Sequence, residues 1–132
     1  MINLYYCLKN YIEEDGFTYS FGDYNMNLKN SICIIFRDGG ATHRDLTSGK
    51  YINRITRFEI VGVAGRKQED ILQMESYLSK VKEKMEVLNN KHLTSGESQV
   101  FISRTDTGDV HHLGKNQQDF TTFSLNGLII YK

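Results

Sequence analysis

Proline is missing from this 132-residue sequence, although it makes up about 5% of an average protein. The turns must therefore be built from the 11 glycines together with asparagine and aspartate. Proline and inward-pointing charges are also means by which natural sheets protect their edge strands from pairing with other chains. A strand-rich chain without proline leaves those edges available, which favours self-assembly.

The chain also lacks an excess of charge of either sign, because 16 Lys and Arg residues balance 16 Asp and Glu residues. Proteins that bind nucleic acids or anionic membranes do so largely through an excess of Lys and Arg. The longest hydrophobic runs, Ile32 to Phe36 and Leu128 to Tyr131, fall far short of the roughly 20 residues needed to cross a bilayer. We therefore expect neither a nucleic acid, sequence-specific or otherwise, nor a membrane among the partners.

Cysteine is scarce, with only Cys7 and Cys33 in the chain. Two cysteines do not make a disulfide framework, and the segment from Met1 to Tyr11 lacks the basic leader and continuous apolar core of a signal peptide. We expect reduced thiols that fill the core of a cytoplasmically made protein. The length and the 39% of hydrophobic residues indicate one soluble globular domain over residues 1–132.

The start of the chain carries a helical pattern and then a mixed one. Apolar residues from Ile2 to Ile12 recur at steps of three and four, which predicts a short helix that ends near Gly16. The stretch from Thr18 to Asn30 is polar and aromatic, and it predicts a short strand followed by turns.

Two strands are predicted next, with a loop between them. Ile32 to Arg37 is β-branched and aromatic, and predicts a strand closed by a turn at 38–40. The polar segment from Ala41 to Lys50 is predicted to be a loop, and loops of this length are often functional. Strand character resumes from Tyr51 to Val63, where alternation predicts one buried face and one charged face.

A helix in the middle of the chain is the clearest element. Its apolar residues recur at steps of three and four: Ile71, Met74, Leu78, Val81, Met85 and Leu88. Lys91 and His92 follow near its predicted end, where cations suit the helix dipole. A coiled coil would need a longer heptad repeat with partner-setting charges, so we expect this helix to lie on a sheet.

The last third of the chain returns to strand patterns. Strands are predicted at 99–105, 109–113, 120–125 and 128–131, with a turn at 106–108 and a turn or bulge at Asn126–Gly127. The order of elements predicts an α+β fold, in which a mostly antiparallel sheet packs against one long amphipathic helix and a short N-terminal helix.

Residues able to carry acid–base or metal chemistry are few. His43 and Asp45 form the closest pair, in the loop predicted after the Ile32 strand. His111 and His112 are adjacent on a predicted strand, so their side chains should point to opposite faces and cannot easily share one ion. No serine lies in a nucleophile-elbow motif. We expect no catalytic residue, no metal and no cofactor.

Several stretches of the sequence, taken with the order of elements, resemble the tail terminator proteins of long-tailed bacteriophages that infect Gram-positive bacteria, which are often labelled minor capsid proteins. These stretches are Ile32–Phe36 running into Arg37–Gly40, the strand Arg57–Val61 ahead of the long helix, and the ending from Leu113–Lys115 through Phe123–Asn126 to Tyr131. The resemblance covers the chain from about Ile32 onward.

Members of that family are structural proteins without enzymatic activity or cofactors. The resemblance implies that copies of the chain form a ring, usually a hexamer, which caps the finished tail tube and offers a docking surface to the head connector. The partners would then be the chain itself, the tail tube protein and the head connector protein. The protein would be made in the host cytoplasm and would act in the virion, at the interface of head and tail.

Within this interpretation, two sets of residues are candidate contacts. Four charged residues on strand faces or ends, opposite the apolar set, are candidates for the interface between subunits: Arg37, Asp38, Arg57 and Glu59. Loops on a rigid scaffold often carry recognition. Three residues at and after the predicted turn are candidates for docking onto a partner: Gly39, Gly40 and His43.

Three other functions stay open at this stage. A head-completion or stopper protein of the connector would share the structural character but would bind the portal side. A small metal-dependent enzyme would use His43, His111 and His112. A host-interaction domain of α+β type is the third alternative.

Overall fold

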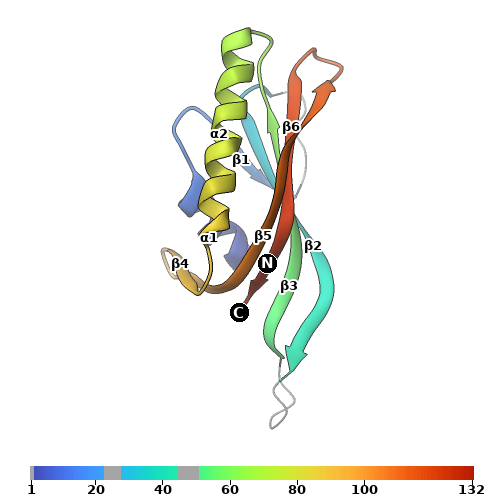
Figure 1. The fold of residues 1–132 in the computed structure, drawn as a ribbon. Coiled ribbons are helices and arrows are strands. Elements are labelled where there is room, and N and C mark those ends of the chain that lie inside the picture. Colours follow the sequence, from blue (N-terminus) through green and yellow to red (C-terminus); the bar gives the residue numbers. More distant parts are fainter. Residues whose placement is uncertain (1, 23–27, 45–50) are drawn as a thin grey trace.

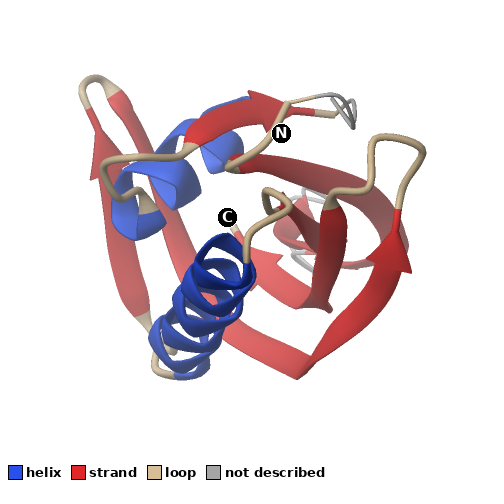
Figure 2. Cartoon of the chain, turned by 90° about the horizontal axis from the view of Figure 1, so that it is seen from above, coloured by secondary structure: helices blue, strands red, loops and turns tan. Residues whose placement is uncertain are grey.

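The computed structural model describes residues 2–22, 28–44 and 51–132, and the side chains of these residues except those of 38–44 and 51–53. Within this part of the chain the elements are α1 (Ile2–Ile12), β1 (Thr18–Phe21), β2 (Ser31–Arg44), β3 (Tyr51–Val63), α2 (Gln68–Glu86), β4 (Lys91–Ser95), β5 (Ser98–Lys115) and β6 (Thr121–Tyr131). The strands form one sheet in the order β1-β2-β3-β6-β5-β4 (Figure 1). The β1–β2 pair is parallel and the other neighbours are antiparallel, and Figure 2 shows how the sheet curls. The fold is therefore α+β.

One face of the sheet, called the inner face below, packs against both helices. α2 lies along β5 and β6 (Figure 1), and its Met74 and Leu78 enter the same core as Ile60 and Leu125 of the central strands. Leu8 of α1 joins this core, and α1 packs against β4 and β5. Burying a side chain of this size fully contributes about 1.5–3 kcal/mol, so the inner face supplies most of the stability.

The opposite face, called the outer face below, carries the residues that alternate with the inner ones. Cys33, Ile35 and Val61 form a second, smaller cluster there, and all three are strand residues. Cys7 of α1 belongs to the main core instead. The two cysteines thus lie on different sides of the sheet, and no disulfide joins them.

β2 is longer than the sequence predicted. Asp38 to Gly40, expected to be a turn, continue the strand, and Asp38 pairs with Thr56 of β3. Gly39 and Gly40 lie at a register shift between Asp38 and Thr42, where β2 has more residues than β3. The turn prediction was therefore wrong, because glycine favours a bulge as readily as a turn. The loop predicted from Ala41 was wrong at its start, because β2 runs to Arg44; residues 45–50, with Asp45, lie outside the described residues.

Two turn signals near the C-terminus were also misread. Residues 106–108 lie within β5, and Asn126 and Gly127 lie within β6. A Cβ atom at position 127 would lie 2.5 Å from ring atoms of Phe58, and closer still to the carbonyl oxygen of Asp106. Glycine is required there by this close approach, not by a turn. The irregularity lies opposite, in β5, between Thr107 and Val110.

The connection after α2 differs from the prediction as well. Lys91 and His92 begin β4 and do not lie at the end of the helix, which stops at Glu86. Asn90 has a φ of 56°, so an asparagine in the left-handed region turns the chain into β4. The β5–β6 connection uses a second device, in which Oδ1 of Asn116 accepts hydrogen bonds from the N–H groups of Gln118 and Phe120.

Tyrosine hydroxyls join α1, β1 and α2. The Tyr77 hydroxyl donates to the carbonyl oxygen of Ile12 over 3.0 Å and lies 2.7 Å from the Tyr19 hydroxyl. The Tyr19 hydroxyl also accepts a hydrogen bond from the N–H of Glu14. Burial raises the pKa of Tyr77, so its hydroxyl stays protonated and able to donate.

Both outer ends of the sheet leave long strands partly uncovered. β1 pairs only with Ser31–Ile34 of β2, and β4 pairs only with Ser98–Ile102 of β5. Beyond these points no strand among the described residues pairs with the outer edges of β2 and β5. β2 and β3 also continue as a hairpin past Arg54, where the pairing of β3 with β6 ends (Figure 1).

Candidate functional site

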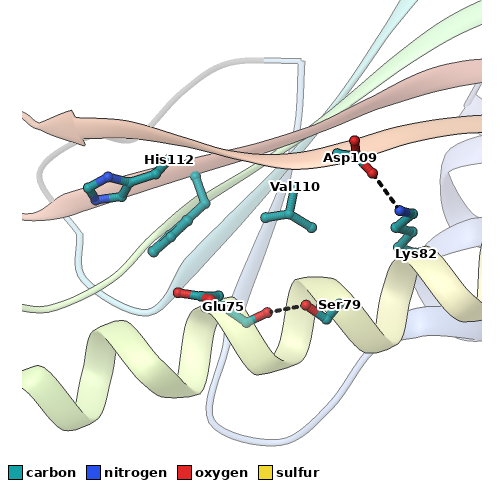
Figure 3. Close-up of a pocket in the computed structure, with 7 residues that line it drawn as sticks. Glu75, Ser79, Lys82, Asp109, Val110 and His112 are labelled. Atoms are coloured by element: carbon teal, nitrogen blue, oxygen red, sulfur yellow. Dashed lines mark hydrogen bonds and ion pairs between the residues drawn. The ribbon is translucent and has the colours of Figure 1, made fainter.

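Two concave surfaces lie on different sides of the sheet. The first, called the helix–sheet groove, has a volume of about 370 Å³ and is lined by Glu75, Ser79, Lys82, Asp109, Val110, His112 and Phe123 (Figure 3). The second, called the arginine pocket, has a volume of about 240 Å³ and is lined by Arg37, Arg57, Phe58, Glu59, Asn126 and Gly127.

An ion pair crosses one end of the helix–sheet groove. Nζ of Lys82 on α2 lies 2.7 Å from Oδ1 of Asp109 on β5 (Figure 3). This hydrogen bond raises the pKa of Lys82 and lowers that of Asp109, so both groups stay charged. The Asp109 side chain is 83% exposed, and exposed pairs of this kind contribute little to stability.

The other polar groups of the groove are engaged in local contacts. The Ser79 hydroxyl donates to the backbone carbonyl oxygen of Glu75, one turn earlier on α2. The His112 ring packs on Phe123 with its centroid 5.1 Å away. Of these contacts only the Lys82–Asp109 ion pair joins α2 to the sheet, and none of them brings a nucleophile together with a base. Among the described residues there is no group of three or more His, Cys, Asp or Glu side chains that could hold a metal ion.

The candidate histidines are distributed over both faces. His111 pairs with Ser124 and His112 with Phe123, and His112 faces the helix–sheet groove. The two neighbours therefore point to opposite faces of β5. His43 lies on β2 opposite Asn53, and its side chain is outside the described set.

The arginine pocket brings together three of the four residues that the sequence analysis named as interface candidates. Arg37 on β2 and Arg57 on β3 are direct partners across the antiparallel pair, and Glu59 lies two residues further along β3. Residues two apart on a strand share a face, so all three side chains project from the outer face. Asp38, Gly39 and Gly40 lie next to Arg37 on β2, at the bulge, and their side chains are not described.

The electrostatics of the pocket are unusual for a sheet surface. Like charges directly opposite one another on neighbouring strands destabilise the pair. Arg37 and Arg57 are both exposed, and neither forms an ion pair within the part of the chain that the structure describes. With one Glu beside two Arg, the pocket carries one positive charge in excess. Guanidinium groups bind carboxylates and phosphates through paired hydrogen bonds, so the pocket suits an acidic group.

The sequence analysis missed the β6 side of this surface. Asn126 and Gly127 complete the arginine pocket, and Leu128 lies opposite Arg57. Leu128 is only half-buried, as are its outer-face neighbours Ile55 and Ile130. The signal for this was the apolar run at the end of the chain, because strands that are apolar on both faces are typically covered on both faces.

Two further findings concern membrane-spanning helices and similarity to known proteins. No helix in the described part of the chain is long and apolar enough to cross a membrane. No model of a known protein family matches the chain, and no curated protein matches it with significance. Function must therefore be inferred from the chain's own surfaces.

Proposed function

We propose that this protein is a structural virion assembly protein, which caps the completed tail tube of a bacteriophage as a ring of identical copies and provides the docking surface for the head connector. The ring is a hexamer, matching a sixfold tail tube. The protein is made in the host cytoplasm and acts in the virion at the head–tail interface. It makes and breaks no covalent bond and needs no cofactor.

The observation that carries this proposal is the asymmetry of the sheet. Helices cover the inner face, whereas the outer face bears half-buried apolar residues beside an exposed arginine pair: Ile55, Leu128, Ile130, Arg37 and Arg57. Apolar area next to arginine is the composition of protein–protein interfaces. The like charges of Arg37 and Arg57 are offset only in part by the one Glu of the pocket, and an acidic partner would remove the remaining cost to the isolated chain.

The long strands support a role in assembly. The β2–β3 hairpin extends past the last pair of β3 with β6, and beyond Ile34 of β2 and Ile102 of β5 the outer edges of these strands have no strand beside them among the described residues. Such edges and hairpins serve as contacts with neighbouring chains. In this proposal one long amphipathic helix, α2, braces the sheet so that the hairpin and edges are held in fixed positions.

A repeated contact between copies closes into a ring only when its rotation divides the circle. A tail tube would supply the template that selects six copies. The ordering cost of association is then partly removed by the tube, so the free protein can be monomeric while the bound protein is a ring.

The test is to measure the mass of the purified protein alone and after mixing with tail tubes, by light scattering and electron microscopy. We expect rings at tube ends and tubes of uniform length. A protein that stays monomeric and neither caps nor shortens tubes would contradict the proposal.

Particles assembled without the protein separate this function from that of a connector stopper. Unjoined tails of abnormal length are expected for a terminator. Filled heads that leak would show a stopper instead, and normally joined particles would exclude both functions.

A further inference from the structure

The solvent side of α2 carries a second unusual surface, called the α2 stripe below. It runs along the helix side opposite the core and consists of Glu69, Leu72, Ser76, Glu83 and Val87, which recur at steps of three, four and seven residues. Leu72 and Val87 are 56% and 58% exposed, which places them among the most exposed large hydrophobic residues of the described chain.

The charge of the α2 stripe is negative. Glu69 and Glu83 are exposed, and neither makes an ion pair within the described residues. Lys80, at the margin of the stripe, lies 4.0 Å from Glu14 and is directed toward the end of α1. The two Glu residues, one ahead of Leu72 and one ahead of Val87, therefore offer carboxylates that have no ion pair among the described residues.

The outer face and the α2 stripe are complementary in charge and composition. The outer face offers Arg37 and Arg57 beside half-buried apolar residues, and the α2 stripe offers Glu69 and Glu83 beside exposed ones. From Leu72 to Val87 the stripe is about 22 Å long at 1.5 Å per helical residue. On the outer face, the uncovered residues of β3 run from Ile55 to Glu59, about 14 Å at 3.4 Å per strand residue, because Val61 is buried; this face therefore covers part of the stripe.

We infer that the outer face of one copy docks onto the α2 stripe of the next copy, with the arginine pair of the first against one of the two glutamates of the second. This inference rests on the self-assembly proposed above and names the two surfaces that perform it. Because the core side of α2 covers the inner face, the stripe and the outer face lie on opposite sides of one chain. A contact between two different surfaces is head-to-tail, and it generates a ring when its rotation closes.

The experiment uses two full-length variants with reversed charges. Variant A is Arg37→Glu with Arg57→Glu, and variant B is Glu69→Arg with Glu83→Arg. Each variant alone would oppose like charges at every contact, so we expect association to weaken by about tenfold or more. In an equal mixture, A and B alternate: the reversed outer face of A meets the reversed stripe of B, and the native outer face of B meets the native stripe of A. We therefore expect the mixture to regain the wild-type mass, measured by sedimentation at low salt, with tail tubes present if the free wild type is a monomer.

The matched control is Glu97→Arg, which changes an exposed acid in the β4–β5 turn. It should leave association unchanged, and circular dichroism should show that every variant folds. If a reversal prevents folding, the milder pairs Arg37→Gln with Arg57→Gln and Glu69→Gln with Glu83→Gln replace it, and a smaller loss of association is expected.

The outcomes distinguish this inference from the proposed function. If A and B each form the same rings as the wild type, or if their mixture does not regain the wild-type mass, the pairing of these surfaces is wrong. Tube capping by the wild type would still stand in either case. Rescue by mixing, without tube capping by the wild type, would support the pairing and overturn the terminator function. A wild type that is monomeric both alone and with tubes would overturn both.

Discussion

The two faces of the sheet are made from alternating residues of the same strands, yet they differ in what covers them. Phe58 and Ile60 of β3 point inward and are buried with residues of both helices. Arg57 and Glu59, their neighbours in sequence, point outward to a surface that includes half-buried Leu128. The difference shows that the strands hold apolar residues on both sides although helices cover only one. The inner face supplies folding energy, and part of the outer face stays in contact with solvent.

The largest loss in the free energy of unfolding is expected when a substitution leaves a cavity between α2 and the sheet. Leu78→Ala removes a fully buried side chain from the inner face, so we expect a loss of about 2–5 kcal/mol in the free energy of unfolding. Leu72→Ala on the solvent side of the same helix should change it by less than about 0.5 kcal/mol. Urea denaturation measures both values. Equal losses would show that α2 does not separate a core side from a binding side.

A smaller loss is expected where β6 approaches Phe58. Gly127→Ala places a Cβ against the Phe58 ring and the Asp106 carbonyl oxygen, and such overpacking typically costs about 1–3 kcal/mol. Gly108→Ala is the control, because the nearest atom to its Cβ would be the Asn126 carbonyl oxygen at 3.4 Å. Thermal unfolding of both variants tests the difference. A neutral Gly127→Ala would mean that β3 and β6 are further apart than described.

The hydroxyl contacts between α1, β1 and α2 should contribute less. Tyr77→Phe deprives the Ile12 carbonyl oxygen and the Tyr19 hydroxyl of a buried partner, so we expect a loss of about 1–2 kcal/mol. Tyr6→Phe, at a residue that is 47% exposed, should be close to neutral. Chemical denaturation of the two variants gives the comparison. If Tyr77→Phe leaves the free energy of unfolding unchanged, α1 is held in place by apolar packing alone.

The smallest effect on folding is expected on the outer face. Arg57→Gln removes one of two like charges on paired strands, so the isolated chain should be unchanged or stabilised by up to about 1 kcal/mol. Unfolding measured at low salt and again at high salt tests the cause, because salt screens the repulsion and should shrink the gain. A clear destabilisation would place the Arg57 side chain in the folding core.

Much of the fold was predictable because its signals are local. The steps of three and four from Ile2 to Ile12 predicted α1. The alternation from Tyr51 to Val63 predicted a strand with the same bounds as β3. Glycine misled the interpretation at Asp38–Gly40 and at Gly127, because a turn, a bulge and a close approach of two strands all favour the same residue.

The candidate site was predictable only in part. Period-two alternation placed Arg57 and Glu59 on one face of their strand. It did not reveal that Arg37 would lie directly opposite Arg57, since that depends on the register of β2 and β3. The contribution of Asn126 depends on β6 entering the sheet beside β3, across more than sixty residues of sequence, and no local pattern encodes such a pairing.

The sequence by itself determined which residues are apolar or charged on each element, because side chains alternate along strands and repeat along helices for reasons of local geometry. Only the tertiary structure decided that α1 and α2 both pack on one face of the sheet, and that two arginines meet on the other. The reason is physical: the register and order of strands come from long-range backbone pairing and from burial summed over the whole core, neither of which is recorded in any short stretch of the chain.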